Sequence, residues 1–382
     1  MPWTRNPFCI PVKSDSDQEE FCTYTNNGFA QGRGITFITT PNVAVSVSVS
    51  QHLKGDQTPQ NEENERIPHP LYEPRETSGR GIGLYATTSI HAGQIIMLSS
   101  PVLVINRNAL DQLSRSLRHK LQRKALAEIS AETRKIFFSL ARSKGGEEID
   151  DIIQTNSIRL SLGGDVGHLA VVPEAARINH ACRPNSYYRF NTTTLLLEVF
   201  ALRDIDDGEE LTFSCKHSSY SRLTNLLTHT TYGYSTQPSS TRQKLLKQHW
   251  SFTCTCPLCS SSPSSLSASN ERLRQISEIQ TILPTLSPPS KLPQLATNLI
   301  KLIDLYSKED LIVEKPKYEE ILVYTYAQMG NEEETRYWGE RAQKGWEIVA
   351  GKGSFEVRRM EGLLGDVRGH GAWGGGRGGE VS

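Results

Sequence analysis

The sequence predicts an α+β fold that is rich in short strands and contains two helical segments. Short apolar stretches between glycine turns indicate strands in residues 84–105. Leucines at helical spacing then indicate a helical insert over about residues 107–156. A second apolar stripe of the same period, between residues 295 and 306, predicts a helical C-terminal region.

Residues 1–72 are interpreted as an N-terminal extension. Valine alternates with small polar residues from Val43 to Ser50, a period that predicts a strand. The polar, proline-containing stretch from Gln51 to Pro70 predicts a linker.

A strand-rich domain is predicted for residues 73–250. It begins with a glycine-dense turn, Gly79-x-Gly81-x-Gly83. Glycine allows a backbone to approach a ligand closely, but glycines also form plain turns, so both interpretations stay open. A dinucleotide-binding loop is disfavoured, because that motif has the spacing G-x-G-x-x-G and is followed by a helix. Here the glycine spacing is different and strands are predicted to follow.

Several later elements can be predicted individually. Ser130 is a plausible N-cap within the helical insert. The stretch Leu169–Val172 and the two flanks of Asn191–Thr194 predict strands, the latter two as a hairpin. The second hairpin strand is expected to continue as far as Phe213.

Beyond the strand-rich domain, residues 251–260 hold a cysteine cluster and residues 261–364 are expected to be helical. Asn331 and Glu334 form a capping-box pattern. The helices resemble tetratricopeptide pairs, but only one pair is convincing, below the roughly three repeats that an independent array needs. The glycine-rich tail, residues 365–382, is expected to be disordered.

Composition excludes some partners. The chain has 382 residues, with 42 Lys and Arg against 42 Asp and Glu. A net charge of zero argues against nucleic acid as the main partner. No apolar run approaches the roughly 18 residues of a membrane span, and the N-terminus has no signal core, so we expect an intracellular protein, in the nucleus or the cytoplasm.

Three of the seven cysteines crowd together as Cys254, Cys256 and Cys259. In an intracellular protein this favours metal binding over disulfides. Structural zinc needs four ligands, so a fourth must come from a distant cysteine: Cys9, Cys22, Cys182 or Cys215. Cys182 is the natural candidate. A redox C-x-x-C pair is the alternative, but the βαβ unit that such a pair requires is missing from the sequence pattern.

The stretch from Arg177 to Asn185 combines two asparagines, a histidine and a cysteine around a proline. A loop of this kind can offer amide and imidazole hydrogen bonds to a polar ligand. A further motif, Asp207 to Ser214, reads Asp-Gly-Glu-Glu-Leu-Thr-Phe-Ser.

Taken in order, these motifs resemble the SET domain with its post-SET zinc segment. They are Gly-Arg-Gly-x-Gly-Leu, Asn-His-x-Cys-x-Pro-Asn, Gly-Glu-Glu-Leu-Thr-Phe and Cys-x-Cys-x-x-Cys. The helical insert and C-terminal helices look like the branch related to SET-and-MYND proteins, without the MYND finger, as in fungal single-SET proteins. The resemblance covers about residues 20–260 firmly and implies small curved sheets around a knotted cofactor site.

The resemblance implies a lysine methyltransferase that uses S-adenosylmethionine and zinc. It places cofactor contacts at these positions: Arg80, Gly81, Ile82, Gly83, Asn156, Asn179, His180 and Phe252. It places zinc at Cys182, Cys254, Cys256 and Cys259. Tyr187, Tyr188 and Phe213 could line a lysine channel, or could be ordinary core aromatics.

One position departs from the family pattern, which continues Leu-Thr-Phe-x-Tyr with a catalytic tyrosine. Here Cys215 stands at the tyrosine position, and a thiol is a weak donor and too short. Removing residues 215–233 would bring Tyr234 to that position. We therefore expect Tyr234 to be the catalytic tyrosine and residues 215–233 to be an insertion, or an unspliced intron.

The predicted function is methylation of lysine in a histone or non-histone protein, by a chain expected to be a monomer that binds no nucleic acid or membrane. A catalytically impaired SET scaffold that binds S-adenosylmethionine and zinc is the alternative, favoured by Cys215. A zinc-stabilised interaction module is a third interpretation, favoured only if the glycine-rich turn binds no ligand.

Overall fold

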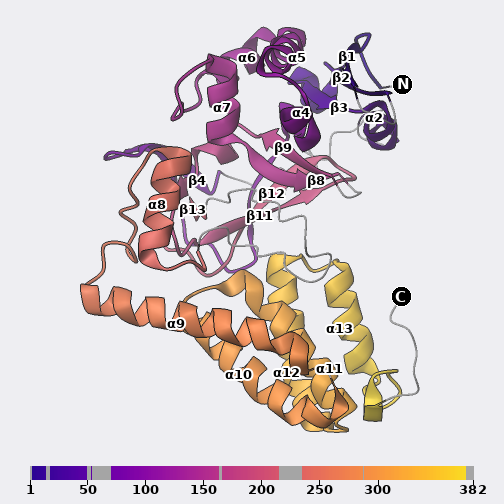
Figure 1. Cartoon of the computed structure of the whole chain (residues 1–382), viewed down its shortest axis with the longest axis vertical. Helices are drawn as coiled ribbons and strands as arrows, with labels where there is room; N and C mark the ends of the chain where they lie inside the picture. The colour runs from indigo at the N-terminus through magenta and orange to yellow at the C-terminus, as the bar shows by residue number, and fades with distance from the viewer. Residues whose placement is uncertain are drawn as a thin grey trace.

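The computed structural model describes residues 2–13, 18–49, 53, 70–162, 166–214, 235–286 and 288–375. Figure 1 shows a strand-rich part, which contains the helical insert, above a bundle of C-terminal helices. The α+β prediction is confirmed. None of the described helices is both long and apolar enough to cross a membrane.

Four small sheets form the strand-rich part. The largest has the order β1-β2-β3-β7-β9-β8, with β1 Phe8–Lys13, β2 Gln18–Asn26, β3 Ile35–Thr39, β7 Leu103–Asn106, β9 Gly167–Val171 and β8 Ile158–Ser161. The three-stranded sheet has the order β11-β12-β6, with β11 Ser186–Asn191, β12 Leu196–Ala201 and β6 Ile95–Ser99. The two pairs are β4 Tyr72–Thr77 with β5 Gly81–Ala86, and β10 Asn179–His180 with β13 Thr212–Phe213.

Helices lie within and after these strands. Near the N-terminus are α1 Phe29–Gly32 and α2 Pro41–Ser48. The insert consists of α4 Arg107–Gln112, α5 Arg115–Glu128, α6 Ala131–Phe138 and α7 Glu148–Asn156, and η2 Ala175–Arg177 precedes the Asn-His loop. Helices therefore form within the predicted insert, but the leucine stripe does not lie on one helix: Leu113 is the C-cap of α4, and Leu117 of α5 is exposed. Ser130 caps α6 by accepting from the Thr133 amide at 3.1 Å.

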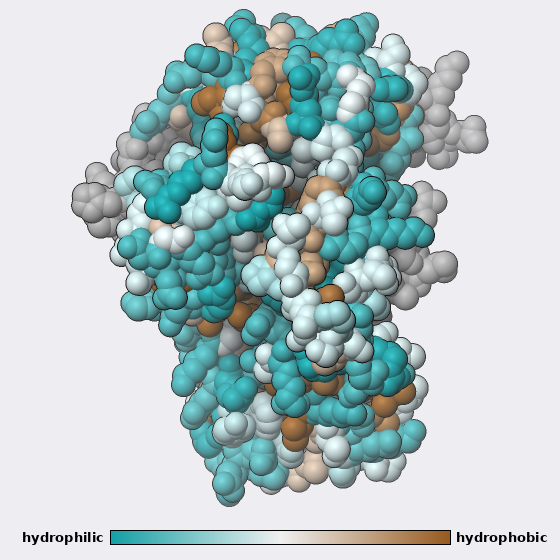
Figure 2. All heavy atoms as spheres, turned by 90° about the vertical axis from the view of Figure 1, so that its left-hand side faces the viewer, coloured by the Kyte–Doolittle hydropathy of each residue, from teal (hydrophilic) through white to brown (hydrophobic). Residues whose placement is uncertain are grey.

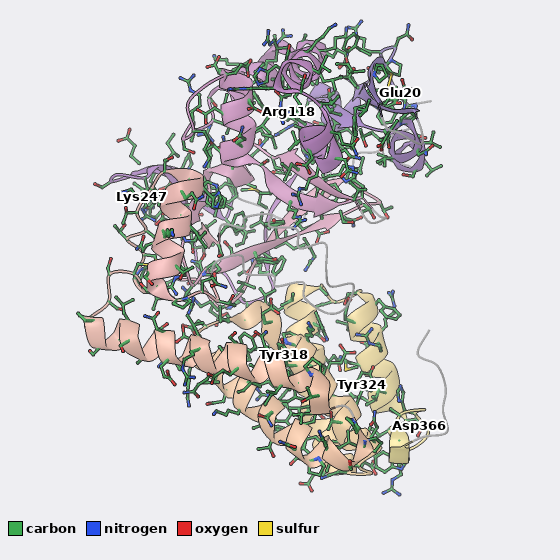
Figure 3. All side chains as sticks on the ribbon, in the orientation of Figure 1. Glu20, Arg118, Lys247, Tyr318, Tyr324 and Asp366 are labelled. Atoms are coloured by element: carbon green, nitrogen blue, oxygen red, sulfur yellow. A yellow bond between two sulfur atoms is a disulfide. The ribbon has the colours of Figure 1, made fainter. Side chains whose placement is uncertain are left out.

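The C-terminal region packs around one apolar core that includes Leu299, Leu302 and Tyr306 of the predicted stripe. Helix α8 Ser239–Trp250 precedes this region and packs instead against the cysteine cluster. The elements of the C-terminal region are α9 Pro263–Ile282, η3 Leu283–Leu286, η4 Pro289–Lys291, α10 Leu292–Lys308, η5 Ile312–Glu314, α11 Lys315–Gln328, α12 Glu332–Val349, α13 Phe355–Gly365 and η6 Trp373–Gly375. Figure 3 labels Tyr318 on α11 inside this bundle, and its ring stacks on that of Tyr306 with centroids 5.5 Å apart. Tyr187 and Phe200 of the three-stranded sheet belong to the same core, so the bundle is joined to the strand-rich part by apolar packing.

The strand predicted for Val43–Ser50 is wrong, because the segment lies mainly in helix α2. Pro41 occupies the first turn of that helix, where its fixed φ suits the start of a helix. Ala44 and Val47, three residues apart, are buried, whereas Val45 is 61% exposed. The alternation of valines therefore does not correspond to alternating burial. Most of the predicted linker lies outside the described residues.

Two other predictions need correction. The hairpin forms as predicted, but its second strand ends at Ala201, and β13 is a separate strand beyond a turn at Gly208. Part of the tail that was expected to be disordered is packed: Val367 is buried in the C-terminal core and Trp373 packs against it. The reason is that apolar residues are interspersed among the glycines.

The cysteines among the described residues divide into two groups. Cys9 and Cys22 lie opposite each other on β1 and β2, with Cα atoms 4.0 Å apart, and form a disulfide. The preference for metal binding over disulfides is therefore wrong for this pair, because antiparallel strand pairing brings two distant cysteines face to face. Cys182, Cys254, Cys256 and Cys259 are free thiols.

Figure 2 views the left-hand side of Figure 1. Hydrophilic residues cover most of this face, and hydrophobic residues show only as scattered spheres.

Candidate active site

Glu210 joins three of the sequence motifs at one point. Its Oε2 accepts a hydrogen bond from Arg80 Nη2 at 2.6 Å, and its Oε1 accepts from Asn179 Nδ2 at 2.9 Å. Thr77 Oγ1 also donates to Oε1, at 3.4 Å. The glycine-rich turn, the Asn-His loop and the Gly-Glu-Glu motif therefore meet at one carboxylate. Sequence reasoning missed the role of Glu210, although its place within a quoted motif was a usable signal.

The glycines serve two different purposes here. Gly79 and Gly81 have φ values of 70° and 71°, which form the turn between β4 and β5. Gly83 instead gives room: a Cβ on it would lie 2.7 Å from Glu210 Oε1 and 2.9 Å from Asn179 Nδ2. The intervening Ile82 is 45% exposed. The backbone of this strand can therefore lie this close to the Glu210 cluster because residue 83 has no side chain.

The Asn-His loop is held by a two-residue parallel pairing. Asn179 pairs with Thr212 and His180 with Phe213, and the Ala181 amide donates to the Phe213 carbonyl at 2.8 Å. Asn185 fixes the other end of the loop. Its Oδ1 accepts from the Thr212 amide at 2.8 Å, and its Nδ2 donates to the Glu210 carbonyl at 2.9 Å. The side chains of the two asparagines thus connect both ends of the loop to the Gly-Glu-Glu motif.

His180 and Phe252 lie against each other, with ring centroids 5.7 Å apart. Burial lowers the pKa of His180 to about 4; the negative charge of Cys256 opposes this shift, and the positive charges of Arg242 and Arg80 add to it. The imidazole is therefore neutral at physiological pH. His180 and Phe252 are 72 positions apart in the sequence, and both are predicted to contact the same cofactor. The structure brings them together.

Arg242 is a feature that sequence reasoning missed. Its side chain is fully buried on α8, and Nη1 donates to the Gln237 carbonyl at 2.7 Å. Its Nε and Nη2 find no hydrogen-bond acceptor among the described residues. A buried guanidinium strongly favours an acceptor, so this corner of the site is suited to a polar group.

Cys182 meets the three cysteines of the C-terminal cluster, as predicted. Its Sγ lies 3.9 Å from that of Cys254 and 3.6 Å from that of Cys259, and all four sulfurs lie within 4.8 Å of one another. Four sulfurs at tetrahedral positions 2.3 Å from zinc would be about 3.8 Å apart. The spacing and the ligand type therefore fit a structural zinc ion.

Helix α8 supports the cysteine cluster from one side. Gln243 donates to the Cys254 carbonyl at 2.7 Å and accepts from the Cys254 amide at 2.9 Å. Leu246, one turn further along, is buried against Ala181 and the cysteines. Figure 3 labels Lys247 on this helix. The backbone of one cysteine is thus fixed by a side chain that belongs to another element.

The four thiols influence one another. Hydrogen bonds from Cys182, Cys254 and Cys259 lower the pKa of Cys256, because they stabilise its thiolate. The pKa of Cys182 is raised, since it donates to its neighbours and is buried. Thiolate is the form that binds a metal, and a cation would favour it at all four positions.

The hydrogen bonds of Asn156 are made to the helical insert and not to the other predicted cofactor-binding residues. It is buried at the end of α7, where Nδ2 donates to the Ala141 carbonyl at 2.7 Å and to the Ile152 carbonyl at 2.8 Å. Both donors of its amide are therefore used within the helical insert.

Cys215, Tyr234 and the predicted insertion 215–233 lie outside the described residues. The residues on either side of them are described, and they touch: Ser214 Oγ and Ser235 Oγ are 2.6 Å apart. The chain therefore leaves and returns to one place, next to β13.

The aromatic residues form a continuous contact beside β13. Tyr188 packs edge-on against Phe213 with centroids 5.5 Å apart, and Tyr187 stacks on Tyr188 at 5.3 Å. The Tyr188 hydroxyl donates to the Arg159 carbonyl at 3.3 Å. Tyr187 is buried and also contacts Phe200, so it belongs to the core that reaches into the C-terminal bundle.

A Gly83→Ala substitution is expected to weaken ligand binding at this site by roughly five- to hundredfold, since overpacking costs roughly 1–3 kcal/mol and each 1.4 kcal/mol is tenfold. The new Cβ would displace Glu210 and Asn179. Gly362→Ala is the matched control, because nothing lies within 4 Å of that position. Isothermal titration with S-adenosylmethionine measures both variants, and equal affinity in both would show that Gly83 does not face the ligand.

Comparison with known proteins adds a family match. Residues 81–216 match the model of the SET domain. A histone-lysine N-methyltransferase set5 of Schizosaccharomyces pombe is 23% identical over 212 residues, 55% of this chain and 54% of that protein. The protein-lysine N-trimethyltransferase SMYD5 of Homo sapiens is 33% identical over 84 residues, 21% of this chain and 16% of that protein. The histone-lysine N-methyltransferase SET5 of Meyerozyma guilliermondii is 35% identical over 86 residues, 22% of this chain and 14% of that protein. The chain thus spans about half the length of the first relative and less of the others.

Proposed function

The chain contains a SET domain, and we propose that it is a protein-lysine N-methyltransferase that uses S-adenosylmethionine. The observation that carries this proposal is the convergence at Glu210 of the glycine-rich turn and the Asn-His loop, with the cysteine cluster one loop away. The names of the relatives, histone-lysine and protein-lysine methyltransferases, support the same reaction.

The proposed cofactor site uses the backbone of Arg80, Gly81, Ile82 and Gly83, the side chains of Asn179 and His180, the ring of Phe252 and, by resemblance alone, Asn156. S-adenosylmethionine would supply an activated methyl group on its sulfonium. The residues fit such a ligand: Gly83 lets the strand lie directly against Glu210 and Asn179, and the Glu210 cluster offers both an acidic and a basic group. A neutral His180 adds no positive charge next to a cationic sulfonium.

The protein does two things in the proposed reaction. It aligns a lysine amine with the methyl group, and it favours the neutral form of that amine. Tyr188 and Phe213 would provide an apolar wall, which lowers the pKa of a lysine ammonium by desolvation. Backbone carbonyls near Phe213 could accept weak C–H···O contacts from the methyl group.

Zinc is proposed at Cys182, Cys254, Cys256 and Cys259 as a structural ion. Cys182 follows Asn179 and His180 in one loop, and Phe252 precedes the other three cysteines. Metal binding at the four sulfurs would therefore fix the loop that carries His180 and the segment that carries Phe252 relative to each other.

Tyr234 is proposed as the catalytic tyrosine. If residues 215–233 were absent, Tyr234 would be the single residue between Ser214 and Ser235. Residues separated by one position have Cα atoms at most about 7 Å apart. The hydrogen bond between the two serine side chains is compatible with such a span, which supports the interpretation of residues 215–233 as an insertion. Transcript sequencing across Phe213 to Tyr234 tests whether residues 215–233 are encoded by an unspliced intron. A continuous coding read through these codons would exclude the intron.

The alternative function is a SET scaffold without catalysis, favoured by Cys215 at the usual tyrosine position. It would bind S-adenosylmethionine and zinc but transfer no methyl group. A zinc-stabilised interaction module would bind zinc alone. Titration with S-adenosylmethionine separates the module from the other two, and turnover on a protein mixture separates the enzyme from the scaffold. The substrate is proposed as a histone or non-histone protein lysine in the nucleus or cytoplasm.

Asn179→Ala is expected to abolish measurable cofactor binding while leaving the domain folded. It removes the amide that is proposed to contact the cofactor, whereas Glu210 keeps its partner Arg80. Isothermal titration gives the affinity and circular dichroism checks the fold. Unchanged affinity would remove Asn179 from the cofactor site.

A further inference from the structure

A buried carboxylate of the C-terminal region contacts the loop of the candidate active site. Glu309 is the C-cap of α10, and its side chain is 1% exposed. It accepts hydrogen bonds from Arg183 Nη2, from Arg272 Nε at 2.6 Å and from Ser269 Oγ at 2.8 Å. Ser269 and Arg272 lie on α9, so two C-terminal helices and the loop meet at this carboxylate.

Arg183 carries the contact into the active site. It directly follows Cys182, and its Nη1 donates to the Cys182 carbonyl at 2.8 Å. The same Nη1 donates to the Ser235 carbonyl at 2.9 Å, at the start of the chain that leads into α8. One guanidinium therefore fixes the backbone of a cysteine of the cluster, a residue next to β13 and the C-terminal carboxylate.

The loop is thus fixed from two sides by different parts of the chain. Asn185 binds it to Thr212 of β13, within the SET domain. Arg183 binds it to Glu309, outside the SET match at residues 81–216. A buried ion pair is costly when one partner is lost, because the other charge stays buried without compensation. Here two arginines share one carboxylate, so loss of Glu309 would leave two cations in the same place.

We propose that Glu309 is a positioning residue, by which the C-terminal helices hold the Asn179–Arg183 loop in the shape that binds metal and cofactor. The part of this inference that concerns cofactor binding rests on the proposed function. The part that concerns the cysteine thiols does not depend on it. The C-terminal region would then have a specific role, which is to hold the Asn179–Arg183 loop in place through the ion pairs of Glu309.

Glu309→Gln in the full chain tests the proposal. Gln keeps the size of the side chain but removes the charge and points an amide toward an arginine. We expect the cluster thiols to react at least about tenfold faster with an aromatic disulfide reagent, and S-adenosylmethionine to bind at least about tenfold more weakly, as for loss of one buried charged partner. The matched control is Glu271→Gln, which breaks the exposed pair Glu271–Arg274 on α9 and should change neither quantity.

Arg183→Gln and the double variant Arg183→Gln/Glu309→Gln complete a double-mutant cycle, and the double variant should be no worse than the worse single variant. Arg183→Lys is the milder substitute if Glu309→Gln does not fold. Thiol reactivity can be measured with or without bound metal and without any cofactor. If the parent chain does not bind S-adenosylmethionine, the proposed function is contradicted, but the prediction about thiol reactivity is still tested. Unchanged thiol reactivity in Glu309→Gln, with only a lower melting temperature, would show that Glu309 merely stabilises the bundle and would overturn the proposal.

Discussion

Cys182→Ser is expected to remove zinc from the chain as completely as Cys256→Ser does, from about one ion per chain to nearly none. The sulfurs of the four cysteines lie within 4.8 Å of one another, although Cys182 is 72 residues from the nearest of the others in sequence. Three thiolates leave a structural zinc site incomplete. Because metal-binding energy is also folding energy, the variants should also lose thermal stability and cofactor affinity together.

Metal analysis of the purified variants measures this directly. Cys9→Ser and Cys22→Ser are the controls: both remove a cysteine, but from the disulfide between β1 and β2, so they should keep full zinc content. Full zinc occupancy in Cys182→Ser would show that the fourth ligand lies elsewhere, and that the metal is not connected to the Asn-His loop.

Tyr234→Phe is expected to lower methyl transfer by about 10²-fold, the order of loss seen when one positioned donor is removed from an active site. Cofactor affinity should stay nearly constant, because the hydroxyl is proposed to act on the reacting geometry rather than on binding. Transfer is measured with radiolabelled S-adenosylmethionine on cell extract and affinity by titration.

The same assay with a chain that lacks residues 215–233 tests the insertion hypothesis, since this variant brings Tyr234 next to Ser214. It should be at least as active as the full chain, and Tyr234→Phe should reduce its activity by a similar factor. Equal activity of Tyr234→Phe and its parent would exclude Tyr234 from the mechanism and would leave Cys215, or a role without catalysis, to be considered.

Ordered motifs and helical periodicity were the informative sequence signals. The cysteine cluster is predictable because zinc needs four ligands and the local segment supplies three. The helical insert is predictable from its leucine spacing, although the structure divides the leucines between two helices: Leu113 is the C-cap of α4, and Leu121 is buried on α5. The resemblance to the SET domain is confirmed by the match over residues 81–216, which includes the Asn-His and Gly-Glu-Glu motifs but not the cysteine motif.

Features that depend on tertiary contacts were not predictable. The valines of Val43–Ser50 have strand spacing, yet packing of Ala44 and Val47 and a proline at the start favour a helix. Cys9 and Cys22 pair only because β1 and β2 align in a particular register. Glu309 looks like an ordinary helix-end residue in the sequence, and only the approach of Arg183 and Arg272 gives it a role.

The most direct test of the proposed function is methyl transfer by the 382-residue chain. The chain is incubated with S-adenosylmethionine labelled on the methyl group and with a protein mixture that includes histones, and the labelled residue is identified by mass spectrometry. Asn179→Ala serves as the control, since it keeps the fold but should not bind the cofactor. We expect label on lysine side chains of protein with the parent chain and none with Asn179→Ala. A parent chain that binds S-adenosylmethionine and zinc but labels no lysine, with and without residues 215–233, would contradict the enzyme and favour the scaffold.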